Sequence, residues 1–247
     1  MNNNSSKGNK NRYTSSRLKH IICSLPYAFI SLFCKRDKKL IIFCAMHCET
    51  FDSNSKFLFL YFLKYEPEYT VKFVINDDSK RNQLIKEYGD HFIDTRTKEG
   101  KRIAIKASVW IVSWLDLPLG GLFLKARRFV LHLGHGTPLK CIGLTEKNGK
   151  LIKKLYYKLN RTNISYSLAS SEFVADIISK CMGFSKKRII VNGQPRTDAL
   201  FLPPLKIPEI DKNSFNILYA PTWRQDSPVQ LFPFSDFSVS ELESFLI

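Results

Sequence analysis

Between residues 40 and 193, short apolar runs alternate with stretches of helical length, and this alternation limits the possible folds more than any other feature. Each run is rich in β-branched and aromatic residues, which is typical of buried strands. Strands that alternate with helices indicate βαβ units around a parallel sheet. The sequence therefore predicts an α/β fold built on a Rossmann-like parallel sheet.

Seven strands and four helices are expected in this region. The strands are expected at residues 40–46, 71–76, 91–94, 109–113, 129–133, 164–170 and 188–193. The helices are expected at residues 55–65, 80–88, 98–107 and 172–181. Asn54 and Ser171 are the expected N-caps of the first and last helix, because their side chains can accept a hydrogen bond from a free backbone N–H.

Positive charge is concentrated at the amino terminus. The chain has a formal net charge of +16, and residues 1–40 contain nine Lys or Arg against one acidic residue, Asp37. Such an excess favours anionic partners, namely phosphorylated substrates, anionic lipid surfaces or nucleic acid. The first 20 residues are polar and rich in Asn and Ser, which is typical of a disordered tail.

An uncharged apolar segment follows at residues 21–34, and a basic cluster comes directly after it. Fourteen residues are too few for a membrane-spanning helix, which needs about 20. Two interpretations remain: a first helix packed on the main domain, or a peripheral anchor at an anionic membrane surface. The anchor would use Phe29, Phe33, Lys35, Arg36, Lys38 and Lys39. Residues 1–39 are thus assigned to a basic tail and a short apolar membrane-proximal segment.

The pattern changes after residue 202. Residues 203–214 contain three prolines and are predicted to form an extended linker. A strand is expected at residues 215–221 and a helix, capped by Ser238 or Ser240, towards residue 247. Residues 215–247 are too few for an independent core, so they either pack on the first domain (40–202) or begin an incomplete donor-binding domain. We expect the second arrangement.

The motif LGHGTPLKCIG, at residues 133–143, follows a predicted strand end, where open α/β folds bind ligands. Two glycines flank His135 and allow unusual backbone angles and the close approach of a ligand. A histidine held there titrates near neutral pH and can take a proton from an attacking hydroxyl. Thr137 and Lys140 could contact phosphate oxygens. The alternative is a Gly-Pro turn with an incidental histidine.

Two further strand ends carry polar side chains. VNGQPRTDALF, at residues 191–201, places Arg196 and Asp198 at the start of a helix, where they could bind a ligand or pair with each other. YAPTWRQD, further along the chain, presents Thr222 and Arg224. Arginine is suited to forked hydrogen bonds with phosphate, so both segments are candidate phosphate contacts.

Together these motifs resemble the CDP-glycerol glycerophosphotransferases of teichoic acid and capsule synthesis. GHGTPLKCIG, GQPRTDALF and ILYAPTWRQD carry the resemblance, and FCAMHCETFDSNSKFLFLYFL, at residues 43–63, fits the family's first strand, loop and helix. The order and spacing of four motifs over residues 40–247 make the resemblance specific. It implies two Rossmann-like domains in a GT-B-like arrangement, with the active site in the cleft.

The resemblance also implies a reaction. Glycerol phosphate or ribitol phosphate would pass from CDP-glycerol or CDP-ribitol to a hydroxyl of a polyprenyl-diphosphate-linked acceptor, with release of CMP. His135 matches the family's proposed general base. The implied substrate-binding residues are Gly136, Thr137, Pro138, Lys140, Arg196, Asp198, Thr222 and Arg224. No metal or other cofactor is implied, and the enzyme is expected as a peripheral protein at the cytoplasmic face of the cell membrane.

One departure from the family concerns its second half. In the family that half carries another histidine and the Asp and Ser positions that hold the donor, whereas His135 is the last histidine of this chain. Transfer requires that the donor phosphate is neutralised while the hydroxyl attacks in line. We therefore expect these 247 residues alone to have little or no transferase activity.

Two alternative functions follow from the same features. One is a nucleotide-sugar glycosyltransferase of GT-B type, and the other is a non-catalytic, membrane-associated remnant. A basic helix is expected at residues 146–161 and carries Lys153 and Lys154. These lysines form either a contact with the membrane surface or acceptor phosphate, or a solvated face. Nucleic acid is not an expected partner, because no helix-turn-helix, zinc-finger or RNA-binding aromatic signature occurs.

The cysteines do not indicate a metal site. Cys44, His47 and Cys48 lie close together, but zinc needs four ligands and no second pair with matched spacing exists. Six scattered cysteines without a CxxC pair are typical of reduced thiols rather than of a disulfide scaffold. Reduced thiols are therefore expected throughout, and buried ones at Cys44 and Cys48.

Overall fold

The computed structural model describes residues 22–146, 151–203, 216, 218, 220 and 238–246. The chain divides into two units at Pro203, and each is considered by itself. Within the described residues, all strands belong to the unit that precedes this boundary.

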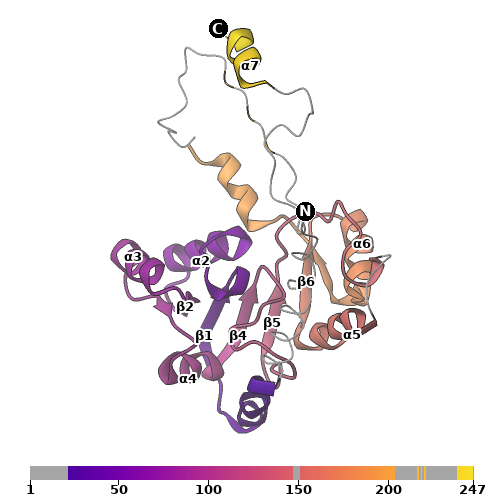
Figure 1. Ribbon diagram of the computed structural model, residues 1–247. Coiled ribbons are helices and arrows are strands. Elements are labelled where there is room, and N and C mark those ends of the chain that lie inside the picture. Colours follow the sequence, from indigo (N-terminus) through magenta and orange to yellow (C-terminus); the bar gives the residue numbers. More distant parts are fainter. Residues whose placement is uncertain are drawn as a thin grey trace, which may run out of the picture. The chain divides into compact units, whose positions relative to one another are not determined.

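That unit is built on a seven-stranded, fully parallel sheet with the strand order β3-β2-β1-β4-β5-β6-β7 (Figure 1). The strands are β1 (Asp37–Cys44), β2 (Thr70–Val74), β3 (Phe92–Ile93), β4 (Ala107–Val112), β5 (Phe129–His132), β6 (Tyr166–Ala169) and β7 (Ile189–Val191). The predicted α/β fold and all seven predicted strands are confirmed. The GT-B-like arrangement of two domains stays a prediction.

The strand order reverses at β1. The chain leaves β1 towards β2 and β3 on one side, then returns to place β4 on the other. At such a reversal the two connections that leave the carboxyl ends of the central strands diverge and open a crevice. The carboxyl ends of β1 and β4 are therefore where this fold is expected to bind ligands.

Helices occupy the connections, as the sequence predicted, except for residues 113–128 between β4 and β5. They are α2 (Ser53–Tyr65), α3 (Asp78–Tyr88), α4 (Lys98–Lys106), α5 (Leu151–Asn160) and α6 (Glu172–Met182). Asp77 caps α3 and Thr97 caps α4 through hydrogen bonds from backbone amides. Ser171 caps α6, where its Oγ accepts from the Val174 amide at 3.2 Å, which confirms that prediction.

The predicted N-cap of α2 is wrong. Asp52 is the N-cap residue, and its side chain makes no capping hydrogen bond. Asn54 lies inside the helix and is fully buried. Burial of an amide is unfavourable unless it forms hydrogen bonds, and those of Asn54 are made to distant loops rather than to its own helix.

The sheet separates two hydrophobic cores because successive strand residues point to opposite faces. On one face Ile41 and Phe43 of β1 join a cluster with Phe59 of α2. On the other, Ile42 joins a cluster with Ala104 of α4. Burial of each large side chain contributes roughly 1.5–3 kcal/mol, so this two-sided core holds the strand ends rigidly.

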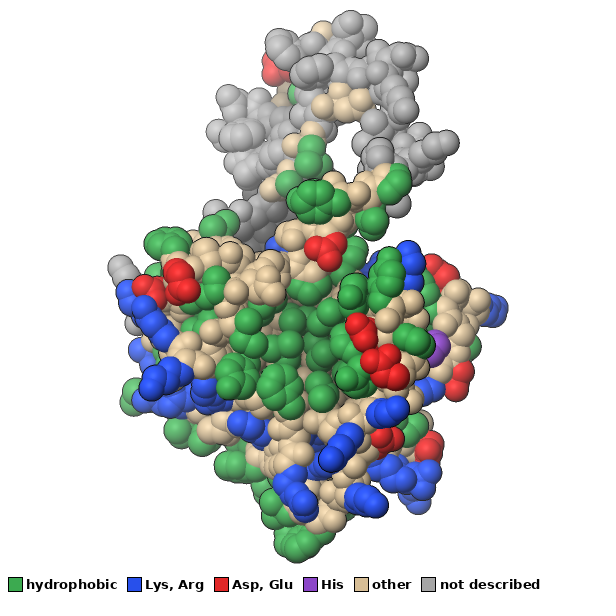
Figure 2. Space-filling view, turned by 180° about the vertical axis from the view of Figure 1, so that it is seen from behind, with side chains coloured by type: hydrophobic (Ala, Val, Ile, Leu, Met, Phe, Trp, Pro, Cys, Tyr) green, Lys and Arg blue, Asp and Glu red, His purple; other side chains and the backbone are tan. Residues whose placement is uncertain are grey.

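A further helix over residues 22–33 precedes β1 and packs with its small side chains inward. Ser24, Ala28 and Ser31 are buried, at a spacing of four and three residues. The large apolar side chains of the same helix are exposed: Ile22, Leu25, Phe29, Ile30, Leu32 and Phe33. Figure 2 shows hydrophobic side chains at this end of the molecule, with Lys and Arg side chains near them.

Hydrogen bonds from Arg36 hold this helix against the domain. Its guanidinium donates to the carbonyl oxygens of Ser31 at 2.6 Å and Ala126 at 2.7 Å, and also to that of Ile105. Burial lowers the pKa of Arg36, and these acceptors stabilise its charge. The neighbouring basic residues are exposed: Lys35, Lys38 and Lys39.

Of the second unit, the structure describes the helix α7 (Val239–Leu246) and three single positions. The Ser238 Oγ accepts a hydrogen bond from the Glu241 amide at 3.4 Å, which confirms the predicted cap. The basic tail of residues 1–20, the linker from residue 204 and most of the strand at 215–221 lie outside the described residues. The predicted domain boundaries stay predictions.

Candidate functional site at the carboxyl edge of the sheet

Loops from four strands meet at the carboxyl edge near the reversal of strand order. They follow β1, β4, β5 and β7, of which the first three are neighbours in the sheet (Figure 1). The predicted motif around His135 is the loop after β5. The structure therefore brings it together with residues that are far away in sequence.

The ring of His135 lies flat against the indole of Trp114, which is in the loop after β4. The ring centroids are 3.6 Å apart and the planes differ by 5°. On either side, Gly134 (φ +67°) and Gly136 (φ +148°) adopt backbone angles that a side chain would disfavour. The two glycines and the indole together fix the position of the imidazole.

The surroundings of His135 favour its neutral form. Loss of solvent around the ring is the largest effect and lowers its pKa, although the residue remains exposed on its other side. The positive charge of Arg196 also lowers the pKa, whereas a hydrogen bond to the Ser113 backbone and the charge of Asp52 raise it. A neutral imidazole at neutral pH can accept a proton, as a general base must.

From helix α2, Asn54 joins two of the loops at this site, those after β5 and β7. Its Nδ2 donates to the carbonyl oxygens of Gly134 at 2.8 Å and Leu133 at 3.3 Å, and to the side-chain oxygen of Gln194 at 3.5 Å. Its Oδ1 accepts from the backbone amide of Arg196 at 3.1 Å. A buried and fully satisfied amide of this kind makes the geometry of the loops specific.

Arg196 reaches the motif from η5 (Pro195–Phe201), the short helix after β7. Its Nη1 donates to the carbonyl oxygen of His135 at 2.8 Å. A Cβ at Gly136 would lie 3.2 Å from its Nη2, so glycine permits this close approach. Asp198 is exposed on the same helix, and among the described residues no ion pair joins it to Arg196.

The structure describes some of the other predicted site residues but not all of them. Thr137 and Lys140 are exposed and Pro138 is half-buried, all in the loop that carries His135. Thr222 and Arg224 lie outside the described residues. Of the basic helix, Lys153 forms an ion pair with Glu146 at 2.7 Å, and Lys154 is half-buried.

The loop between β1 and α2 is also part of the site, and its backbone is strained. His47, Cys48 and Ser53 have positive φ angles between 55° and 58°, which are rare outside glycine. The Asp116 carboxylate accepts from the His47 amide at 2.9 Å and holds this loop against the one after β4.

All six cysteines of the chain are free.

Asp52, Asn54 and Trp114 were not predicted as site residues. Trp114 directly follows a predicted strand, so the criterion that selected His135 also applies to it. Asp52 and Asn54 follow the first strand by several residues, and nothing local distinguishes them from helix-capping residues.

Comparison with known proteins identifies relatives. A family model for CDP-Glycerol:Poly(glycerophosphate) glycerophosphotransferase matches residues 27–246. The teichoic acid poly(glycerol phosphate) polymerase of Bacillus subtilis (strain 168) is 24% identical over 251 residues, which covers 89% of this chain and 32% of that protein. The teichoic acid glycerol-phosphate transferase of Staphylococcus aureus (strain NCTC 8325 / PS 47) is 24% identical over 217 residues, which covers 78% of this chain and 52% of that protein.

The chain thus spans about a third to a half of the length of these curated relatives. Among solved structures, the wall teichoic acid polymerase TagF has a TM-score of 0.70 and 18% identity, over 98% of this chain and 64% of that one. A TagF histidine-to-asparagine variant with CDPG has a TM-score of 0.71 and 19% identity, over 98% and 63%. Identity at this level shows a shared fold. Because the family model matches most of its length, the chain belongs to the CDP-glycerol:poly(glycerophosphate) glycerophosphotransferase family.

Proposed function

We propose that this protein transfers glycerol phosphate from CDP-glycerol to a hydroxyl of a membrane-bound, polyprenyl-diphosphate-linked acceptor in teichoic acid or capsule synthesis. The observation that carries the proposal is the stacking of His135 on Trp114 at the edge where this fold is expected to bind ligands, and the loss of solvent around the ring, which lowers its pKa, supports it. Family membership supports the donor class. CDP-ribitol is the alternative donor.

In the proposed reaction His135 acts as the general base. The neutral imidazole takes the proton of the acceptor hydroxyl while the hydroxyl oxygen attacks the phosphorus that bears glycerol. A phosphorus–oxygen bond forms, the bond to the bridging oxygen of the diphosphate breaks, and CMP leaves with that electron pair. Donor phosphates need positive charge or N–H groups around them as charge develops.

Further residues have proposed roles in substrate binding. Lys140, Thr137 and Arg196 lie in the loops next to the proposed base, and Thr222 and Arg224 would contribute from the donor side. We place the donor in a second Rossmann-like domain that begins near residue 215, in a GT-B-like arrangement. The length of the curated relatives supports this arrangement.

The experiment is a substitution of His135 in the protein as its gene encodes it. His135→Asn keeps a hydrogen-bonding side chain but cannot act as the base, so CMP release should fall by about 10²–10⁴-fold. His91→Asn is the matched control, because His91 lies at the opposite edge of the sheet, beside the start of β2. Unchanged CMP release in His135→Asn would contradict the proposed role.

Donor competition separates the alternatives. CDP-glycerol or CDP-ribitol should protect the enzyme from thermal unfolding, and a nucleotide sugar should not. Protection by a nucleotide sugar alone would favour a glycosyltransferase. Vesicle binding without turnover of any donor would favour a non-catalytic role.

We propose that the protein works at the cytoplasmic face of the membrane as a peripheral protein. The outward face of the helix over residues 22–33 supports this, because Phe29 and Phe33 are 65% and 74% exposed on a surface flanked by exposed lysines. Apolar side chains beside basic ones are typical of interfacial anchors. Within the described residues, no helix has the length and apolar character needed to cross a membrane.

A further inference from the structure

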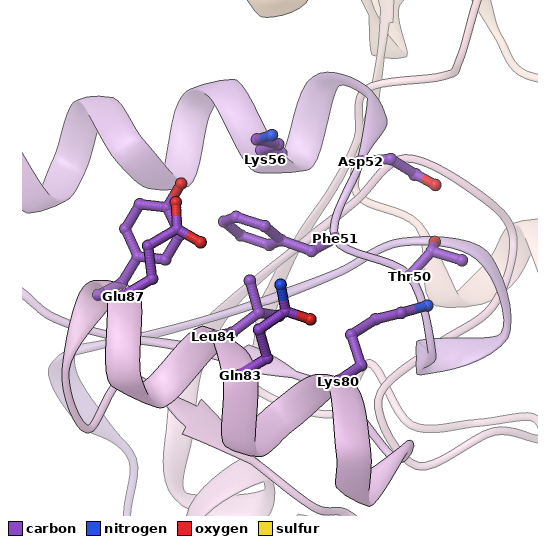
Figure 3. A pocket seen from close by; sticks show the side chains of 9 residues that line it. Thr50, Phe51, Asp52, Lys56, Lys80, Gln83, Leu84 and Glu87 are labelled. Atoms are coloured by element: carbon purple, nitrogen blue, oxygen red, sulfur yellow. The ribbon is translucent and has the colours of Figure 1, made fainter.

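A cavity of about 370 Å³ lies between α2 and α3, close to the carboxyl end of β1. Figure 3 shows Lys56 on one helix, Lys80, Gln83 and Glu87 on the other, and Phe51 between them. We call it the α2–α3 cavity. Its volume is in the range of small-molecule sites.

The polar side chains of the α2–α3 cavity balance in charge. The lining residues include two with ammonium groups, Lys56 and Lys80, and two with carboxylates, Asp52 and Glu87, while Gln83 adds an amide. Burial, followed by the neighbouring Glu87, raises the pKa of Tyr88 to about 12, so this lining phenol keeps its proton. A balanced set of donors and acceptors suits neutral hydroxyl groups, which both donate and accept, better than a bare anion.

The two lysines are held in place. The Lys80 Nζ donates to the carbonyl oxygen of Glu49 at 3.0 Å, and the Lys56 Nζ lies 5.3 Å from the centroid of the Phe51 ring. Fixed donors lose less side-chain entropy when a ligand binds. The cavity is therefore partly preorganised.

Two buried polar atoms of its lining are without a partner. The Thr50 Oγ1 and the Asp52 Oδ1 are both shielded from solvent and form no hydrogen bond. Such atoms cost free energy unless something satisfies them, and they are uncommon in folded proteins. Because neither atom is open to solvent, a ligand hydroxyl reaches them only if the loop over residues 50–52 shifts.

Asp52 links the cavity electrostatically to the proposed base. It lines the cavity, and its charge raises the pKa of His135. A second cavity, of about 280 Å³, lies near the start of β2 at the other edge of the sheet and contains none of the site residues. The α2–α3 cavity is therefore the better candidate for a ligand site, because it includes a residue that acts on the proposed base.

We propose that the α2–α3 cavity binds the polyhydroxylated part of the acceptor and presents one of its hydroxyls to His135. This rests on the proposed transferase function. The ligand class is a polyol, supplied either by glycerol phosphate units or by a sugar. Lys80 and Gln83 would position it from α3.

The first test is direct binding to the protein. Glycerol, sn-glycerol 3-phosphate, N-acetylglucosamine and inorganic phosphate are titrated separately, and chemical shifts of residues in the cavity are followed by NMR. The polyol probes should shift Gln83 and Thr50, and the phosphorylated or the sugar probe, whichever binds more tightly, identifies the source. If inorganic phosphate alone shifts them, or if no probe does, the proposal is wrong.

The second test uses matched substitutions on α3. Gln83→Leu and Lys80→Leu should each raise the acceptor KM about five-fold with kcat unchanged, since each removes one hydrogen bond to bound acceptor. Asn82→Leu and Lys86→Leu are the controls, because neither residue lines the cavity. Equal KM values in the cavity variants and the controls would overturn the proposal.

The outcomes separate this proposal from the function on which it rests. If His135→Asn abolishes CMP release while the cavity variants match their controls, the transferase stands and the α2–α3 cavity is not its acceptor site. If the polyol probes bind in the cavity but no CDP-alcohol is consumed, the polyol site stands and the transferase function fails.

Discussion

At the scale of single residues, His135 depends on side chains that its own motif does not contain. The indole of Trp114 covers one face of the ring, and Arg196 and Asp52 set opposing charges beside it. Asn54 connects the backbone just before His135, at Gly134, to Arg196 in the loop after β7. Residues outside the motif therefore set the solvation, the charge and the backbone position around His135.

Removal of the indole should raise the pKa of His135. In Trp114→Leu the covered face of the ring becomes solvated, so the pKa should rise towards about 6.5, the value of a solvated histidine. The fraction of His135 side chains that are neutral at pH 6 should then be smaller than in the unsubstituted protein. An NMR pH titration of the His135 ring protons measures this directly.

Trp114→Phe is the control, because a phenyl ring still covers part of the imidazole and the pKa should rise less. Arg196 and Asp52 remain in both variants, so their charges affect the two in the same way. An unchanged or lower pKa in Trp114→Leu would show that the indole does not desolvate the ring.

At the scale of elements, the helix over residues 22–33 is inverted relative to an ordinary surface helix. Its small residues face the domain and its large apolar residues face outward. The rings of Phe29 and Phe33 lie edge to face, with centroids 5.3 Å apart. Such an exposed apolar surface is typical of an interaction site.

Loss of both rings should weaken binding to lipid. Phe29→Ser combined with Phe33→Ser removes two large apolar groups from the outward face, so partitioning onto phosphatidylglycerol vesicles should fall at least about ten-fold. Cosedimentation with vesicles measures the partition coefficient. Phe173→Ser is the matched control, since Phe173 is 74% exposed on α6; equal losses in the two proteins would argue against a membrane role for the helix.

At the scale of the whole domain, the proposed membrane surface and the proposed base lie at opposite edges of the sheet. The helix over residues 22–33 precedes the start of β1, and His135 follows the end of β5, which is parallel to it. The eight residues of β1 span about 26 Å at roughly 3.3 Å per residue. If the proposed function holds, a lipid-linked acceptor has to span this distance to reach His135.

Acceptor length should therefore control the rate on vesicles. A short lipid-linked acceptor keeps its hydroxyl near the membrane, whereas a longer one reaches His135, so the rate should rise with length. Water-soluble acceptors of the same lengths should show little such dependence. CMP release is measured for both series, and equal dependence on length in the two would contradict the proposed orientation.

Much of the fold followed from local patterns. All seven strands were predicted because buried parallel strands are nearly continuous apolar runs, and the caps Ser171 and Ser238 were predicted from short-range hydrogen bonding. His135 was selected because it follows a strand end between two glycines. These signals lie within a few residues of each other, so they can be read from the sequence.

The sequence by itself determined the α/β class, the strands and helices, and the motif that holds the proposed base. The tertiary structure decided which residues surround that base, because the strand order places the loops after β1, β4, β5 and β7 together. Asn54 shows the difference: its sequence position indicates a helix cap, but hydrogen bonds to Gly134 and Arg196 are available only after the sheet has formed. Local patterns encode short-range contacts, whereas contacts between distant loops depend on how the whole chain packs.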